Sequence, residues 1–111
     1  MIIEKQTFLN CTKLNSVNLP LKLTNIGSQA FYGCRKLSKI SLPNTLKYID
    51  DEAFMWCVNL SEIYIPENVE RIKDTAFRYS NVTVYAPHEY TYYGIDDIHY
   101  YSCGIKNWIV K

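Results

Sequence analysis

Residues 37–59 read LSKISLPNTLKYIDDEAFMWCVN, and residues 60–82, which follow directly, read LSEIYIPENVERIKDTAFRYSNV. Both stretches are 23 residues long and place Leu, Pro and the pair Ala-Phe at the same positions. The same pattern already appears in residues 14–36, which read LNSVNLPLKLTNIGSQAFYGCRK. Self-similarity at a fixed period of roughly 20–50 residues is the sequence signature of solenoids and related repeat architectures. The repeat therefore decides the fold.

Columns of apolar or small residues keep the 23-residue spacing through this region. One repeat cannot bury these residues alone, whereas stacked repeats share a continuous core with their neighbours. We therefore expect each column to form an inward-facing ladder, with residues about 4.8 Å apart where strands pair in parallel. The columns are Ile3-Ile26-Ile49-Ile72, Phe8-Phe31-Phe54-Phe77, Cys11-Cys34-Cys57-Ser80, Leu14-Leu37-Leu60, Val17-Ile40-Ile63, Leu19-Leu42-Ile65 and Leu23-Leu46-Val69.

Each repeat is expected to contain two extended segments. Leu37–Leu42 is predicted to form a short strand with Ile40 and Leu42 facing inward, because its apolar residues alternate toward the end. Pro43 ends that strand, since proline has no backbone N–H to donate. Leu46–Ile49 is predicted to be a second, weaker extended segment.

The segment that follows the second extended piece is predicted to be helical. Ser28, Asp51 and Asp74 occupy one column, two residues before the repeated alanine, and these residue types favour a helix N-cap. Residues 29–33 and their equivalents are therefore expected to form a single helical or 3₁₀ turn. The sequence thus predicts an α/β solenoid of mostly short β-strands with one short helical turn per repeat.

The repeat is incomplete at both ends of the region. The first copy begins in its middle at Ile3, and Pro87 follows Pro66 by 21 residues, so the last copy is two residues short. We predict a repeat array over residues 1–87, with about 3.5 repeats. The half-copy at the N-terminus has no repeat above it, so we expect it either to self-associate or to continue a longer array.

Residues 88–111 are predicted to form a C-terminal cap within the same structural domain. Apolar residues at helical spacing predict a short helix between Gly94 and Gly104, and residues 107–110 are expected to form a closing strand. The aromatic residues of this tail are interpreted as a plug for the open end of the core. The alternative is an aromatic platform for a glycan or a partner protein. These aromatic residues are Tyr90, Tyr92, Tyr93, Tyr100, Tyr101 and Trp108.

Composition argues against several classes of function. Twelve Lys and Arg residues against eleven Asp and Glu give a net charge of +1, whereas a nucleic-acid binder would present a basic patch or stripe. No apolar run approaches the roughly 18–20 residues of a membrane span. Residues 1–5 lack the basic start and long apolar stretch of a signal peptide. We therefore expect neither nucleic-acid binding nor membrane insertion.

The cysteine column is interpreted as packing rather than chemistry. Free cysteine is among the most buried residue types, so Cys11, Cys34 and Cys57 are expected to be structural thiols. Ser80 takes the fourth place, which packing tolerates and a metal site would not favour. Disulfides or a metal site remain the functional alternatives, although ladder geometry rarely gives the orientation a disulfide needs. Cys103 lies outside the column and is expected to be exposed.

The sequence contains no catalytic, metal or cofactor motif. Paired ligands at C-x₂₋₄-C spacing are absent, as are G-x-S-x-G, H-E-x-x-H and a glycine-rich phosphate loop. Asp96, Asp97 and His99 cluster, but one polar helical turn explains them, and His88 follows Pro87 in a turn. We therefore expect no enzyme activity, no metal site and no cofactor.

The exposed columns between the inward strand residues are better candidates for function. They should line one face of the sheet, where repeat proteins commonly bind, and tyrosine is enriched at interfaces. Lys39 with Glu62, and Lys47 with Glu70, are adjacent in their columns and are candidate ion pairs. The alternative is that these side chains are simply solvated. The candidate binding face is Asn18, Ser41, Tyr64, Tyr85, Lys39 and Glu62, with Ser16 and Thr83 beside it.

The order of these columns resembles the BspA-type leucine-rich repeat, which follows L-x-x-I-x-L-P with L-x-x-I-x-x-x-A-F-x-x-C. The resemblance covers residues 2–87, and the tail is similar to the capping segment that often closes such arrays. The motif stands here as Leu37-x-x-Ile40-x-Leu42-Pro43, then Leu46-x-x-Ile49-x-x-x-Ala53-Phe54-x-x-Cys57.

This resemblance implies a leucine-rich-repeat solenoid that serves as a non-catalytic protein-interaction module. Members of the family are typically surface or secreted proteins of bacteria and some protozoa, associated with adhesion and protein binding. The resemblance therefore implies a protein partner, a cell-surface or secreted location and a role in adhesion. The alternative is a purely structural terminal repeat-and-cap segment that closes a longer solenoid without contacting a ligand.

Overall fold

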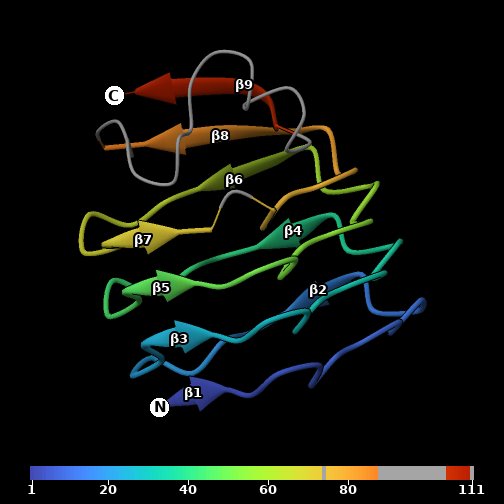
Figure 1. Ribbon diagram of the computed structural model, residues 1–111, viewed down its shortest axis with the longest axis horizontal. Helices are drawn as coiled ribbons and strands as arrows, with labels where there is room; N and C mark the ends of the chain where they lie inside the picture. The colour runs from blue at the N-terminus through green and yellow to red at the C-terminus, as the bar shows by residue number, and fades with distance from the viewer. Residues whose placement is uncertain (74, 88–104, 111) are drawn as a thin grey trace.

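The computed structural model describes residues 1–73, 75–87 and 105–110, and shows a parallel β-solenoid. Its coils are stacked one above another, from the N-terminus at the bottom of Figure 1 to the C-terminus at the top. Most of the strands are only two residues long, because turns interrupt the extended backbone twice in each coil. The predicted solenoid is thus confirmed.

Two series of strands run along the stack. The first series forms one four-stranded parallel sheet from β1 (Ile2–Ile3), β3 (Asn25–Ile26), β5 (Tyr48–Ile49) and β7 (Arg71–Ile72). The second series contains a pair, β2 (Ser16–Val17) and β4 (Lys39–Ile40). It continues in a three-stranded parallel sheet of β6 (Glu62–Tyr64), β8 (Val82–Ala86) and β9 (Ile105–Val110).

The strand register follows the sequence repeat. Ile3 pairs with Ile26, Ile26 with Ile49, and Ile49 with Ile72, so partners are one 23-residue repeat apart. Between β6 and β8 the offset falls to 21 residues, because Tyr64 pairs with Tyr85. The two missing residues therefore lie in the connection, and the register of the sheet is preserved.

The predicted columns form the core. Phe31, Phe54 and Phe77 are fully buried, and Phe8 stacks on the first of them. Ring centroids along the ladder are 5.0, 5.3 and 5.4 Å apart, with interplanar angles of 11° or less. Several apolar residues of the first two coils are only partly buried against this core. They are Phe8, Cys11, Leu14, Val17, Leu19, Ile40 and Leu42.

The predicted helical turn is wrong, because the described residues contain no helix. In the turn segment of a coil, every second N–H group donates a hydrogen bond to the carbonyl three residues earlier. Examples are the bonds from Ala30 to Gly27 and from Tyr32 to Gln29. The intervening N–H groups donate to the next coil instead, as from Phe31 to the carbonyl of Ala53. A helix would direct these donors along its own axis, to carbonyls of the same segment, whereas here alternate donors reach the next coil. The segment therefore forms successive β-turns that also hold the coils together.

Two columns of these turns hold residues in the left-handed region of backbone space. Gln6, Gln29 and Glu52 have φ near 60°, and the second column contains Asn10, Gly33, Trp56 and Tyr79 with φ between 55° and 74°. A positive φ at the third residue is what a type II turn requires. The expected N-cap role of Ser28 and Asp51 does not apply here. Their carbonyl groups accept hydrogen bonds from the preceding coil.

The closing strand expected at residues 107–110 is present and begins two residues earlier, as β9. It pairs in parallel with β8, with an irregularity in register beside Val82 and Thr83. The predicted helix between Gly94 and Gly104, and most of the tail, lie outside the described residues. Within the described part of the chain, no helix has the length and apolar character needed to cross a membrane.

Candidate binding face

Strand alternation decides which side chains reach solvent on β6. Successive side chains of a strand point to opposite faces, so Ile63 is buried while Glu62 and Tyr64 are exposed. Tyr64 is 54% exposed, which is unusual for a large aromatic side chain. Lys39, Ser41 and Asn18 are exposed in their coils as well. The structure therefore exposes the predicted residues of β2, β4 and β6 as the sequence indicated.

Tyr64 and Tyr85 form a stacked pair. Their ring centroids are 4.7 Å apart and the rings are nearly parallel, with an interplanar angle of 10°. The register of β6 and β8 places the two residues directly opposite each other, which is the arrangement that lets side chains on one sheet face interact. Ser41, which has no ring, occupies the next place in the column, so the aromatic part of this column ends at Tyr64.

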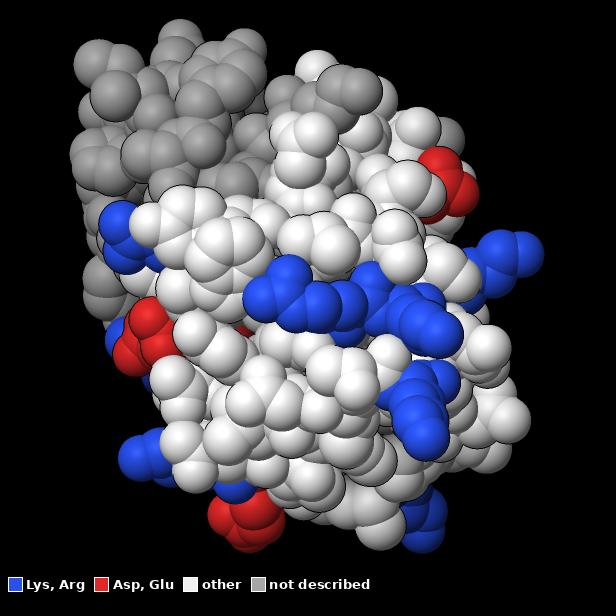
Figure 2. Space-filling view, turned by 90° about the vertical axis from the view of Figure 1, so that its right-hand side faces the viewer, with Lys and Arg blue, Asp and Glu red and all other residues white. Residues whose placement is uncertain are grey.

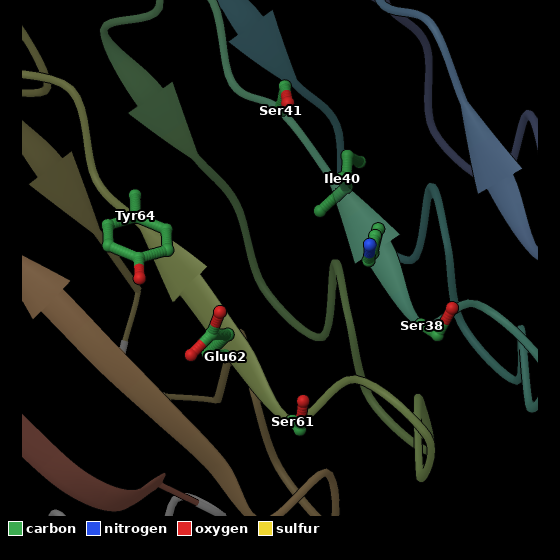
Figure 3. A pocket seen from close by; sticks show the side chains of 7 residues that line it. Ser38, Ile40, Ser41, Ser61, Glu62 and Tyr64 are labelled. Atoms are coloured by element: carbon green, nitrogen blue, oxygen red, sulfur yellow. The ribbon is translucent and has the colours of Figure 1, made fainter.

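A shallow depression of about 210 Å³ lies between β4 and β6, next to Tyr64 (Figure 3). Figure 3 shows Glu62 and Tyr64 projecting from β6. Across from them lie Ile40, at the end of β4, and Ser41, the next residue. The depression combines one aromatic ring, hydroxyl groups and charges of both signs. Its lining is Ser38, Lys39, Ile40, Ser41, Ser61, Glu62 and Tyr64.

The acidic side chains of this face interact with tyrosine hydroxyls. Partial burial, and then the negative charge of Glu62, raise the pKa of Tyr64 above its ordinary value. On the other strand series, a hydrogen bond with Glu70 raises the pKa of Tyr48 in β5. Glu62 and Glu70 thus form hydrogen bonds with the hydroxyl groups of Tyr64 and Tyr48. Their pairing with Lys39 and Lys47 stays a prediction. Both tyrosines stay protonated at neutral pH and can donate a hydrogen bond.

A second depression, of about 350 Å³, adjoins the first at Ser41 and lies between the segments that follow β2 and β4. Asn18 and Ser41 line it together with apolar side chains, of which Leu21 is the most exposed. Ser41 belongs to both depressions. The structure therefore brings Lys39, Ser41, Glu62 and Tyr64 around one hollow, with Tyr85 behind Tyr64 and Asn18 in the adjoining hollow.

The sequence interpretation missed Leu21 and Ile109 on this face. Leu21 shares its column with Asn44 and Glu67, and an apolar residue in a polar column was a signal that could have identified it. Ile109 pairs with Tyr85 and is 38% exposed, so it extends the exposed column beyond the tyrosines. Its place depends on the irregular register of β9, which no repeat spacing predicts.

A second group of aromatic residues was also missed. Trp56 and Tyr79 lie one repeat apart in the turn segments and stack with ring centroids 4.6 Å apart. The guanidinium groups of Arg35 and Arg78 lie over these rings. The signal was present in the sequence, because two large aromatic residues follow each other in a column that begins with Asn10 and Gly33.

Two cysteines of the repeated column are part of the buried core. Cys34 and Cys57 are buried, free thiols, and each donates a hydrogen bond to the phenylalanine carbonyl of the coil below, Phe8 or Phe31. Burial raises the pKa of Cys34 to about 11 and that of Cys57 to about 12, so both thiols are protonated at neutral pH. Ser80 continues the column by bonding to Phe77. Among the described residues, no group of acids, histidines and cysteines is arranged to hold a metal ion.

The remaining chemical candidates of the sequence lie elsewhere. His88, Cys103 and the cluster of Asp96, Asp97 and His99 are all outside the described residues. The same holds for the tyrosines between residues 88 and 104, so the plug and the aromatic platform stay as alternative predictions.

Comparison with known proteins places the repeat in one family. Residues 1–107 match the family described as BspA type leucine rich repeat region (6 copies). The chain belongs to the BspA-type leucine-rich repeat family. Among solved structures, the crystal structure of the T. pallidum leucine-rich repeat protein (TpLRR) is 33% identical, with a TM-score of 0.73. A search of curated proteins found no match.

The match to TpLRR covers 76% of this BspA-type chain but only 40% of the TpLRR chain. It therefore supports the family and the fold over the repeat region, and it leaves the activity of any longer protein to be proposed. Leucine-rich repeats typically present a surface for another protein and are typically not catalytic.

Proposed function

We propose that this BspA-type repeat segment is a non-catalytic protein-interaction module that binds its partner through the Tyr64 face. The observation that carries the proposal is the exposed ring of Tyr64, stacked on the half-buried Tyr85 beside a depression lined by polar and charged groups. Tyrosine combines large contact area with a hydrogen-bonding hydroxyl at low entropic cost, which is why it is enriched in binding surfaces. Cell-surface adhesion is the setting that family resemblance favours.

The stack also prepares the surface for binding. A ring held against its neighbour has less conformational freedom to lose on association than an isolated tyrosine, so less free energy opposes binding. Lys39 and Glu62, on opposite sides of the depression, offer charges of both signs to a polar partner. A protein segment with mixed polar and apolar side chains fits this lining.

The test uses a random-peptide library displayed on phage, selected against the immobilised chain. We expect the selected peptides to lose at least about tenfold in affinity for the variant Tyr64→Ala/Tyr85→Ala, since central aromatic residues dominate interface energies. Tyr48→Ala removes a partly exposed tyrosine from β5, in the other strand series, and is the matched control, expected to bind normally. Selected peptides that bind the double variant as tightly as the wild type would exclude the Tyr64 face.

The same variants separate two other interpretations. An array of purified glycans probed with the wild-type chain tests the sugar alternative, and a signal lost in Tyr64→Ala/Tyr85→Ala would assign the face to a glycan. If neither peptides nor glycans bind the chain, the purely structural alternative, a segment that closes a longer solenoid, replaces the proposal.

A further inference from the structure

A second aromatic cluster, with Trp56 half-buried and Tyr79 exposed, lies on the turn segments, away from the Tyr64 face. Trp56 and Tyr79 stack there, and the guanidinium carbon of Arg35 lies 5.5 Å from the centroid of the Trp56 ring. The guanidinium carbon of Arg78 lies 5.4 Å from the centroid of the Tyr79 ring. We call these four residues the arginine–aromatic ladder.

In the ladder, the ring faces are contacted by each other and by the guanidinium groups, while the edges of the guanidinium groups remain available for hydrogen bonds to a ligand. Arg35 comes from the coil before Trp56 and Tyr79 from the coil after it, so Trp56 is contacted from both neighbouring coils. A guanidinium group that lies over an aromatic ring keeps its in-plane N–H donors free for another partner. Arg35 and Arg78 are both exposed, so those donors can reach a ligand in solution.

This side of the solenoid is basic although the whole chain is nearly neutral. The turn segments lie along the right-hand side of Figure 1, and Figure 2 views that side. Blue basic side chains cross the middle of the view, whereas red acidic side chains lie toward its margins. The equivalent stretches 8–15, 31–38, 54–61 and 77–83 contain Lys13, Arg35, Lys36 and Arg78, and no Asp or Glu.

We propose that the arginine–aromatic ladder is a docking site for an acidic peptide segment of a partner protein. Each guanidinium group presents two parallel N–H donors that match the two oxygens of one Asp or Glu carboxylate. The rings hold the arginines in place and so reduce the entropy lost when a carboxylate binds. Val58, 46% exposed, and Tyr79, 48% exposed, supply apolar contact for a hydrophobic side chain between the acids.

The geometry favours a peptide over other anions. Bases of single-stranded nucleic acids bind aromatic side chains by stacking on an open face, and the ladder's ring faces are already contacted by each other and by arginine. A sugar ring needs an open face in the same way. A carboxylate on a flexible peptide needs only guanidinium edges and a nearby apolar contact, and the ladder provides both.

The probe is a fluorescein-labelled peptide with four repeats of Glu-Glu-Leu, titrated with the full chain at neutral pH and low salt while anisotropy is recorded. We expect Arg35→Gln/Arg78→Gln to weaken binding by about tenfold or more, because hydrogen bonds to charged groups are lost. Lys22→Gln/Lys47→Gln removes the same charge from exposed sites outside both proposed surfaces and should change affinity by less than about twofold. Arg35→Lys/Arg78→Lys should recover only part of the loss, since lysine lacks the planar fork.

A second readout localises the peptide. The indole N–H signal of Trp56, assigned in an NMR spectrum by its loss in Trp56→Phe, should shift on titration. Tyr64→Ala/Tyr85→Ala should leave the titration unchanged, so a failure here is distinguishable from a failure of the Tyr64 face. Far-UV circular dichroism and Tm confirm that each variant is folded.

Three results would overturn the proposal. The first is an absence of binding at low salt. The second is an equal loss of affinity in Arg35→Gln/Arg78→Gln and in Lys22→Gln/Lys47→Gln, which would show attraction by net charge alone. The third is equally tight, arginine-dependent binding of polygalacturonate or of a thymidine oligonucleotide, which would make the ladder a general polyanion site.

Discussion

At the scale of single residues, backbone contact between coils leaves almost no free space at some positions. Gly27 is the sharpest case. A Cβ added there would lie 2.7 Å from the carbonyl oxygen of Ile3 and 2.8 Å from the backbone nitrogen of Lys5. Both neighbours are backbone atoms of the preceding coil, which cannot rotate away as the end of a side chain can.

Gly27→Ala should therefore destabilise the fold by about 1–3 kcal/mol, the usual cost of inserting a group into closely packed structure. Urea unfolding followed by circular dichroism measures the free energy of unfolding. Ser28→Ala, one residue further along, is the control and should cost less. An unchanged midpoint for Gly27→Ala would mean that the coils separate locally without penalty.

The buried thiols predict a pH dependence. The folded protein holds the protons of Cys34 and Cys57 more tightly than the unfolded chain, because burial raises their pKa from 9.0 to about 11 and about 12. Their contribution to stability is therefore complete below about pH 9 and is lost as the pH rises through the folded values. The free energy of unfolding of the wild type should fall over that range.

Cys34→Ser/Cys57→Ser isolates this effect, since serine does not titrate there and Ser80 already occupies the column in the fourth coil. Subtracting the unfolding free energy of the variant from that of the wild type removes the titration of other groups. The difference should decline between about pH 9 and 11. A difference that stays constant over this interval contradicts the assignment.

At the scale of one element, the turn segment explains why apolar spacing misled the helix prediction. Phe31 and Cys34 are three residues apart, which fits one face of a helical turn, but it also fits two successive β-turns. The choice depends on where the intervening N–H groups donate, and they donate to the next coil. This hydrogen bonding offsets the roughly 1–2 kcal/mol that an L-residue costs in the left-handed region.

Gln29 gives a test of this element. Its φ is 57°, and its amide side chain bonds to Glu52 at 2.7 Å and to Gln6 at 2.6 Å. Gln29→Ala and Gln29→Gly both remove these bonds, but glycine alone is relieved of the left-handed cost. We expect the glycine variant to be more stable than the alanine variant by about 1 kcal/mol.

The control is an exposed position outside the left-handed columns. At Ser38, alanine should be the better substitute, because glycine loses more backbone entropy on folding by about 0.5–1 kcal/mol. Thermal unfolding of the four variants gives the comparison. A preference for alanine at both positions would argue against the left-handed turn.

At the scale of the whole molecule, stability comes from ladders that cross every coil. The ring of Phe54 is fully buried and stacks against a ring on each side. Among the described residues, Phe8 stacks on Phe31 alone and is partly buried. Because each coil contacts only its neighbours, a residue's contribution depends on its place in the stack.

Phe54→Ala should cost about 3–5 kcal/mol, the usual loss for a buried phenylalanine, and Phe8→Ala distinctly less. A domain of this size is stabilised by only about 5–15 kcal/mol, so the central substitution should lower Tm sharply. Differential scanning calorimetry of both variants measures the contrast. Equal costs at the two positions would show that the N-terminal coil is as well packed as the centre.

The sequence by itself determined the repeat length, the coil order and the core columns of this BspA-type solenoid. It could do so because a column such as Phe31-Phe54-Phe77 needs the same residue in the same place in each coil. The same regularity predicted that Asn18, Ser41 and Tyr64 would be exposed, since residues between inward strand positions must face solvent.

Only the tertiary structure decided what these exposed residues form together. Repeat spacing places Tyr64 and Tyr85 in one column, but the stack, the depression at Lys39 and Glu62, and the addition of Ile109 depend on register and side-chain orientation. The turn geometry was decided in the same way. An N–H group of the turn segment can donate to a carbonyl of its own coil or of the next coil. The second acceptor is within reach only after the coils are stacked.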